Sequence, residues 1–362
     1  MKKAQISMQF NWIFVLIAGA LILVFFANVI NTQTKFSRSK IAATVLNDID
    51  AISTGAEVSR GTIQVINVPN LNLGFRCTET CSCTYSLSDT QVPYGDKVMF
   101  APDLVKGIRM LAWTNDWSMP YRVSNMVLIT SPEVRYIILE DANNEDLVSD
   151  IFAELPPRLM KIDDSEELVF NKELVAKNDL PNIQDLNNYK VKIIGFDGFD
   201  LSREIPKNLQ SMGDAFVTAI KISPNDRLIS FYQKEGNSWS TDPTTLPFLE
   251  KSLLYAAIFA ENPEMYRCGT ERILHKMQFV TDVYKERTEG LLASFLSCQT
   301  PYDESLQILD DMDQTVTDIL SDGLKEGDKQ DFIDLNNAAY GGAGLNRKNE
   351  ALQTVSSCEG MY

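Results

Sequence analysis

WIFVLIAGALILVFFANVI, residues 12–30, is an apolar stretch, and no Asp, Glu, Lys or Arg occurs between Lys3 and Lys35. A helix rises about 1.5 Å per residue, so this stretch is long enough to cross a hydrocarbon core of roughly 30 Å. A cleaved secretory signal has an apolar region of only about 7 to 15 residues followed by a small-x-small site. We therefore predict a permanent transmembrane helix over residues 11–31.

Composition indicates that the rest of the chain is folded and faces water. The chain has 362 residues, of which 44% are hydrophobic, and this excludes a disordered stalk. It carries 33 Lys plus Arg against 49 Asp plus Glu, a net charge of -16. Because nucleic-acid binding needs a basic surface, we expect no nucleic-acid partner, and the lipid bilayer is the first expected partner.

Six cysteines form two groups along the sequence: Cys77, Cys81, Cys83, Cys268, Cys298 and Cys358. An even number in a membrane-anchored protein fits disulfides, which persist in an oxidising exterior. The alternative is a metal bound by the thiolates of the Cys-x3-Cys-x-Cys cluster. A structural zinc site needs four ligands, however, and the only histidine, His275, lies about 190 residues away in a predicted helix. Disulfides are favoured, and no cofactor is expected.

Helical rise limits how the cysteines pair. Cys268 and Cys298 lie near opposite ends of one predicted helix, about 45 Å apart, and cannot pair unless that helix breaks. Cys358 is near the end of the chain and is free to reach either one. We predict that Cys298 pairs with Cys358, and that Cys268 pairs with one of the cysteines at 77, 81 and 83.

The N-terminal sequence KAQISMQF, residues 3–10, resembles the class III signal of archaeal type IV pilin-like proteins. In that family a prepilin peptidase cuts before the Gln, and the apolar helix remains as membrane anchor and filament core. The resemblance implies a cut between Ala4 and Gln5 and contacts with other pilin-like subunits through the N-terminal helix. Ala4 stands where the family usually has Gly, and Gln9 stands where it usually has Glu. These departures, together with a length of 362 residues, favour a minor pilin or pilin-like surface protein over a bulk filament subunit.

Periodicity divides the chain into sections. Apolar residues at 41, 42, 45, 46, 49 and 52 have helical spacing and predict that the anchor helix continues and packs on its own domain. We expect an α+β or α/β fold with these sections: a short basic N-terminus (1–10), the transmembrane helix (11–31), a helical extension (32–60), a β-rich section with cysteines (61–125), an α/β unit (126–236) and a helical C-terminal region (237–362). The α/β unit is predicted from short apolar strands, at 126–129, 136–139, 190–196, 215–222 and 228–232, alternating with helices at 145–155 and 202–211.

Acidic residues follow two of the predicted strands. Glu140 and Asp141 come after one, and Asp197 and Asp200 after another. Ligands of open α/β sheets collect at the carboxyl ends of strands, where carboxylates hold Mg²⁺ or act as acid and base. Turns also favour Asp and Gly for backbone reasons, and neither phosphate-binding glycine motif occurs. These four residues are an alternative metal site, and no catalytic residue is predicted.

The prediction is a single-pass membrane protein with a structural, adhesion or assembly role, no catalysis, and its C-terminal domain on the exterior face. The first alternative is a membrane-tethered enzyme or ligand-binding module that uses the acidic strand ends. The second reverses the topology and places the domain in the cytoplasm. Lysines flank the apolar stretch on both sides, so charge does not fix the orientation.

Overall fold

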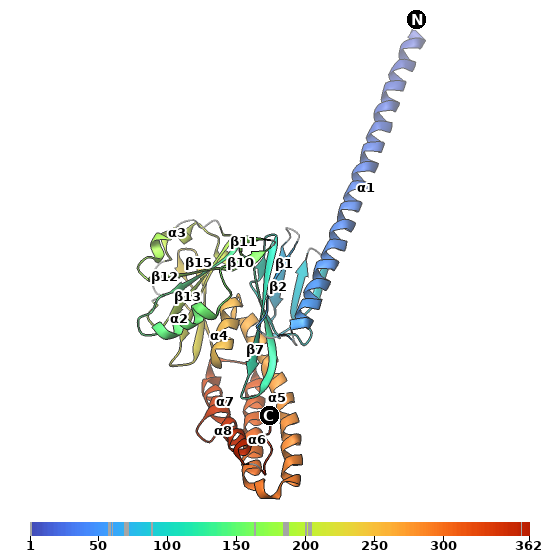
Figure 1. The fold of residues 1–362 in the computed structure, drawn as a ribbon. Coiled ribbons are helices and arrows are strands. Elements are labelled where there is room, and N and C mark those ends of the chain that lie inside the picture. Colours follow the sequence, from blue (N-terminus) through green and yellow to red (C-terminus); the bar gives the residue numbers. More distant parts are fainter. Residues whose placement is uncertain are drawn as a thin grey trace.

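The structure is a computed structural model, and it describes residues 2–56, 59, 61–68, 72–87, 90–162, 164–183, 188–199, 201, 205–355 and 357–362. For residues 2–14, 35–39 and 41 it describes the backbone and not the side chains. Its first element, α1 (Lys2–Ala56), is a helix of 55 residues that projects away from the rest of the chain (Figure 1). Within it, Val15–Thr34 is long and apolar enough to cross a membrane and is not buried at any position. The structure therefore contains the apolar helix that the sequence predicts.

The last third of α1 packs on the chain's own β strands. One face of this helix segment is buried against strands β3 (Cys83–Leu87), β4 (Thr90–Pro93) and β8 (Arg122–Thr130). Its residues have helical spacing: Ala42, Leu46, Ile49 and Ser53. The Tyr85 hydroxyl donates to Asp50 on the same helix (3.2 Å), and Lys97 forms an ion pair with that carboxylate. The helical stripe after the apolar segment therefore covers the chain's own domain, as its spacing predicted.

Two four-stranded sheets make up the β-rich section, with strand orders β1-β7-β8-β5 and β4-β3-β2-β6. Their strands are β1 (Ile63–Asn67), β2 (Leu73–Cys77), β3 (Cys83–Leu87), β4 (Thr90–Pro93), β5 (Met99–Phe100), β6 (Leu104–Val105), β7 (Arg109–Ser118) and β8 (Arg122–Thr130). The predicted strand at 126–129 exists, but it belongs to this section and not to the α/β unit. The reason is the tight β7–β8 hairpin, which pairs residues 126–129 with β7.

A seven-stranded sheet forms the α/β unit, with strand order β12-β9-β13-β14-β15-β16 and β17 paired with β15. Its elements are β9 (Val134–Leu139), α2 (Glu145–Glu154), the β10–β11 hairpin (Leu159–Ile162 and Ser165–Leu168), β12 (Asn171–Val175), η1 (Leu180–Asn182), β13 (Lys190–Phe196), α3 (Lys207–Gln210), η2 (Asp214–Phe216), β14 (Val217–Ser223), β15 (Leu228–Glu235), β16 (Ser238–Trp239) and β17 (Thr244–Pro247). Strands β12, β9, β13 and β14 run parallel, and β15 is antiparallel to β14. Strands β9, β13 and β14 are buried almost throughout, as expected for parallel strands that are covered on both faces, whereas β12 (NKELV), at the edge of the sheet, is mostly half-exposed.

The C-terminal region is helical from Glu250 onward, whereas β16 and β17, which fall within the predicted section 237–362, belong to the α/β sheet. It comprises α4 (Glu250–Phe259), α5 (Pro263–Ser294), η3 (Leu296–Cys298), α6 (Gln299–Asp322), η4 (Glu326–Asp328), α7 (Lys329–Tyr340) and α8 (Leu345–Thr354). Helices α5 and α6 lie side by side and extend away from the sheets, with α7 and α8 beside them (Figure 1). The larger hydrophobic core runs from Ala42 of α1 to Met361, so the predicted sections share much of their interior. A second core, which includes Ile137 and Ile193, lies on the other face of the α/β sheet. The mixed class of helices and sheets is confirmed.

Two buried lysines hold helix ends against the central sheet. Lys192 of β13 donates to the carbonyl oxygens of Ala257 (2.9 Å) and Ala260 at the end of α4. Lys172 of β12 donates in the same way to the carbonyl oxygens of Phe152 and Leu155 (2.9 Å) at the end of α2. Carbonyls at a helix C-terminus lack hydrogen-bond partners within the helix and carry partial negative charge. A lysine ammonium group donates hydrogen bonds to them and also offsets this charge.

Burial lowers the pKa of Lys192 to about 7, although Glu261 acts to raise it. Between pH 7 and 10 the unfolded chain then binds a proton that the native chain does not, so this lysine makes the free energy of unfolding rise with pH. Between pH 6.5 and 9, the free energy of unfolding of Lys192→Met should rise by about 2 kcal/mol less than that of the wild type. Urea unfolding in detergent measures this difference. The exposed Lys207→Met is the control. Equal pH slopes for wild type and Lys192→Met would contradict this assignment.

Candidate functional site

The acidic strand ends lie at one edge of the parallel sheet. Strands β9 and β13 are parallel neighbours, so Glu140 and Asp141 after β9 lie on the same edge as Asp197 after β13. From β9 the chain crosses to β12 on one side, and it then returns to β13 on the other side. In open α/β sheets, this reversal of direction opens a crevice where ligands bind. Glu140, Asp141 and Asp197 therefore lie at one edge of the sheet, as expected from their positions after parallel strands.

Asp141 joins the two turns at this edge. Its Oδ1 oxygen accepts a hydrogen bond from the backbone N–H of Asn143 (2.9 Å), and its Oδ2 accepts one from Gly198 (3.2 Å). A Cβ atom at Gly198 would lie 2.8 Å from Oδ2, so a side chain there would push the Asp141 carboxylate out of this position. This carboxylate is thus committed to holding the turn after β9 against the turn after β13.

Two pockets flank this connection. One, of about 630 Å³, is lined by Asp197, while the other, of about 560 Å³, is lined by Glu140 and Asp141. Asp200 lies outside the described residues. Among the residues that the structure describes, no three carboxylates bring their oxygens within 4.8 Å of one another. The three described members of the proposed acidic site are therefore divided between two pockets.

The cysteines, in contrast, do converge. Strands β2 and β3 form a hairpin in which Cys77 and Cys83 lie directly opposite each other and are joined by a disulfide, with their Cα atoms 4.0 Å apart. The tip of the hairpin is a turn closed by a hydrogen bond from the Cys81 N–H to the Thr78 carbonyl (3.0 Å). Cys81 has a φ of 56°, and this left-handed conformation ends the turn.

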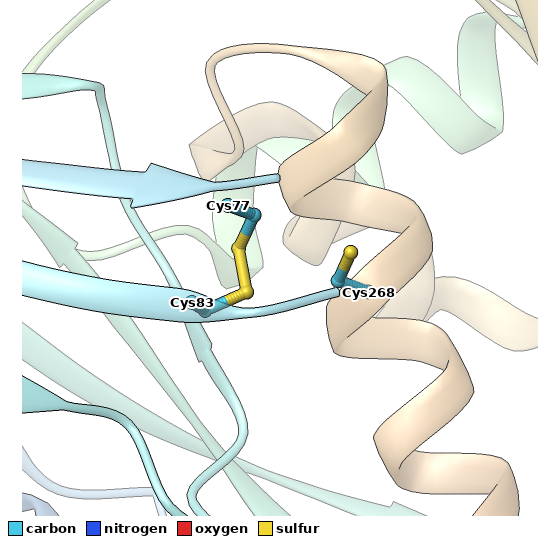
Figure 2. Close-up of side chains that lie close together, drawn as sticks. All are labelled: Cys77, Cys83 and Cys268. Atoms are coloured by element: carbon cyan, nitrogen blue, oxygen red, sulfur yellow. A yellow bond between two sulfur atoms is a disulfide. The ribbon is translucent and has the colours of Figure 1, made fainter. Parts of the chain in front are cut away.

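Helix α5 contributes the fourth sulfur. Cys268 lies on the second turn of α5 and forms a disulfide with Cys81, 187 residues earlier. The Sγ atoms of Cys77, Cys83 and Cys268 lie within 4.8 Å of one another, and all three residues are buried. Figure 2 shows the Cys268 side chain beside the Cys77–Cys83 bond. Two disulfides therefore form one compact cluster, which we call the sulfur cluster: Cys77, Cys81, Cys83 and Cys268.

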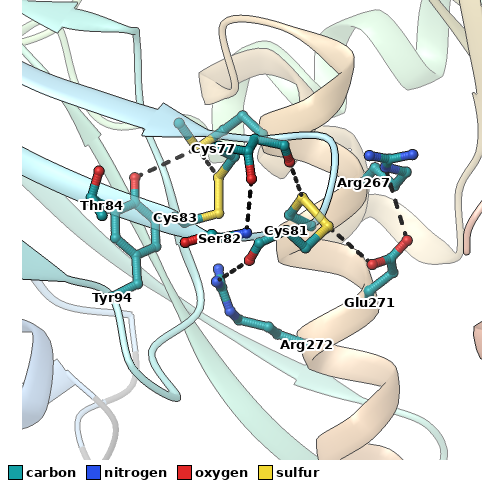
Figure 3. Close-up of a disulfide and its surroundings, with 12 residues drawn as sticks. Cys77, Cys81, Ser82, Cys83, Thr84, Tyr94, Arg267, Glu271 and Arg272 are labelled. Carbon is teal, nitrogen blue, oxygen red and sulfur yellow. Dashed lines mark hydrogen bonds and ion pairs between the residues drawn. A yellow bond between two sulfur atoms is a disulfide. The ribbon is translucent and has the colours of Figure 1, made fainter.

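Charged side chains of α5 surround the hairpin tip (Figure 3). Arg272 donates to the Cys81 carbonyl (3.0 Å), and Arg267 donates to the Glu79 carbonyl. One oxygen of Glu271 accepts from the Leu324 N–H (3.0 Å), and the other lies 3.1 Å from the Cys81 sulfur. A disulfide sulfur carries no hydrogen, so this last approach is a contact and not a hydrogen bond.

The third disulfide, Cys298–Cys358, ties the C-terminal tail to the start of α6. Hydrogen bonds reinforce the tie: the Tyr302 hydroxyl donates to the Glu359 carbonyl (2.8 Å), and Asn349 accepts from the Met361 N–H. The structure thus has the Cys298–Cys358 pair, and it pairs Cys268 with one of the three early cysteines. Both agree with the pairings favoured from the sequence.

His275 is exposed on α5 and is not part of the sulfur cluster. Three neighbouring aromatic residues, Trp113 and Trp117 on β7 and Tyr121 after it, are all buried. They therefore present no open aromatic surface.

No protein-family model matches this chain, and neither does any curated protein or solved structure in the comparisons. A function must therefore be argued from the chain's own geometry. Two features carry that argument: the exposed apolar segment of α1 and the sulfur cluster.

Proposed function

We propose that this chain is a single-pass membrane protein of the pilin-like class, an accessory surface subunit with a structural, adhesion or assembly role. One observation carries the proposal: α1 is a single helix that exposes Val15–Thr34 and then docks its last third on the folded domain. The same element thus serves as anchor and as part of the domain.

The apolar segment needs a partner that is not part of the folded domain. Leu16 and Leu23 expose 70% and 72% of their surface, and their neighbours along the helix are similar. Soluble proteins rarely expose contiguous apolar patches of more than a few hundred Å². Lipid tails, or the helices of neighbouring subunits within a membrane or filament, would remove this surface from water.

The cysteines support an exterior domain. All six are paired, and two of the disulfides join segments that are 187 and 60 residues apart. Such bonds form and persist outside the reducing cytosol. In this proposal the prepilin-like N-terminus is cut before Gln5, which leaves α1 as the anchor.

We expect the protein purified from its native membrane to have a mass that begins at Gln5, with cysteines that react with alkylating reagent only after reduction. Because a small residue precedes the cut in the family that the N-terminus resembles, Ala4→Leu should retain the first four residues, whereas Ser7→Ala should be processed like wild type. Intact-mass measurement checks all three. A wild-type mass that includes Met1–Ala4, together with free thiols, would overturn both the processing and the exterior placement.

The alternative function is a membrane-tethered enzyme or ligand-binding module at the carboxyl edge of the sheet. The two pockets beside the Asp141–Gly198 contact favour it, since they flank the crevice between β9 and β13. Against it, Asp141 already has two backbone partners. Calorimetric titration with Mg²⁺ and Ca²⁺ distinguishes the two ideas, because the structural proposal expects no saturable heat from this edge.

A further inference from the structure

We propose that the sulfur cluster is a thiol–disulfide exchange site, at which an external thiol opens the Cys81–Cys268 bond and Cys268 then attacks the Cys77–Cys83 bond. The co-reactant is a small thiol or a cysteine of a partner protein. This activity is independent of the membrane role proposed above. It follows from the position of one disulfide directly beside the other.

Proximity is the first support. The Cys268 sulfur lies within 4.8 Å of both sulfurs of the neighbouring disulfide, and exchange requires the attacking thiolate to reach one of them. The remaining approach is small enough for a change of side-chain rotamer to supply. In contrast, no third cysteine of the described chain lies within the same distance of Cys298 and Cys358.

Access is the second support. Cys81 is the only partly exposed member of the sulfur cluster, and it lies at the hairpin tip. Cys77, Cys83 and Cys268 have relative exposures of 7%, 3% and 0%. An external thiol therefore reaches the Cys81 sulfur first, and the sulfur that leaves is the buried Cys268, already next to its next target.

The steps balance without an oxidant or a reductant. The external thiolate bonds to the Cys81 sulfur, the Cys81–Cys268 bond breaks, and Cys268 takes the electron pair as thiolate. This thiolate then bonds to Cys83, the Cys77–Cys83 bond breaks, and Cys77 becomes the thiolate. Attack by Cys77 on the mixed disulfide at Cys81 releases the external thiolate. The products are Cys83–Cys268 and Cys77–Cys81, and the number of disulfides is unchanged.

The test uses the full-length Cys81→Ser variant, which leaves Cys268 as a thiol beside the intact Cys77–Cys83 bond. After equilibration at pH 8, free thiols are blocked with maleimide, and the labelled peptides are identified by mass spectrometry. Cleavage after Glu79 separates Cys77 from Cys83. We expect label on Cys77 or Cys83 as well as on Cys268.

The matched control is Cys358→Ser, which frees Cys298 where no second disulfide is near. Its label should stay on Cys298, with at least about tenfold less label on other cysteines than in Cys81→Ser. Label confined to Cys268 in a folded Cys81→Ser variant would overturn the proposal.

The wild-type chain provides a second measurement that does not depend on a variant's folding. When limiting glutathione is added first and maleimide is added afterwards as the trap, exchange predicts that the label is shared between Cys77 and Cys268 and appears on them before Cys298. If Cys268 is labelled while the Cys77–Cys83 bond persists, the two disulfides act separately and the proposal is wrong.

Discussion

Arginine in place of both Leu21 and Val24 is expected to move the chain from the membrane fraction to the soluble fraction. Both positions lie near the middle of Val15–Thr34 and expose most of their surface. Each arginine near the centre of a membrane-spanning helix costs about 2.5 to 3.5 kcal/mol, so two cost about 5 to 7 kcal/mol. The measurement is the share of protein that stays in the membrane pellet after alkaline carbonate washing.

The matched control places the same charges on the same helix beyond the apolar segment. Ala43→Arg with Asn47→Arg changes two exposed positions and should leave the pellet fraction unchanged. If the Leu21→Arg, Val24→Arg variant remains in the pellet like wild type, something other than α1 holds the chain there, and the single-pass assignment is lost.

Truncating the buried stripe at the C-terminal end of α1 is expected to destabilise the folded domain. Truncating Leu46 and Ile49 to alanine removes side chains with 1% and 2% exposure from the interface between α1 and the β strands. Each truncation of this kind costs about 2 to 5 kcal/mol, and because the two are neighbours their costs need not add. We expect a lower free energy of unfolding in urea and faster proteolysis after the apolar segment.

Thr44→Ala with Asn47→Ala is the control, because both side chains are exposed on the opposite face of the same helix. Changes at such surface positions usually stay within about 0.5 kcal/mol. An equal, small effect for both pairs would mean that the stripe adds little to the domain's stability, and the view of α1 as a shared element of anchor and domain would fail.

Strong periodic patterns made much of this fold predictable. The apolar segment, the stripe after it and the parallel strands β9 and β13 all follow from spacing and continuous apolar sequence. The sequence predicted a helical C-terminal region without assigning α7 and α8 as separate helices, since they are short and depend on burying a few residues, such as Phe332 and Leu345. Similarly, β7 contains Asn and Asp and becomes a strand through its pairing with β8.

The acidic strand ends and the cysteine pairs could likewise be predicted only in part. That β9 and β13 end at one edge follows from their being parallel, but the separation of Asp197 from Asp141 depends on turns whose geometry no periodicity encodes. The pairing of Cys268 with an early cysteine follows from elimination. Which cysteine it meets depends on how α5 docks on the β2–β3 hairpin, a contact between segments 187 residues apart.

Because α1 is helical from Lys2 to Ala56, it also fixes the rotational phase of the domain. Each residue of a helix turns the chain by about 100° and advances it about 1.5 Å. The seven residues between Thr34 and Ala42 therefore determine how the domain is rotated about the helix axis relative to the apolar segment. A single inserted residue there would leave anchor and domain intact and yet turn the domain by more than a quarter of a circle.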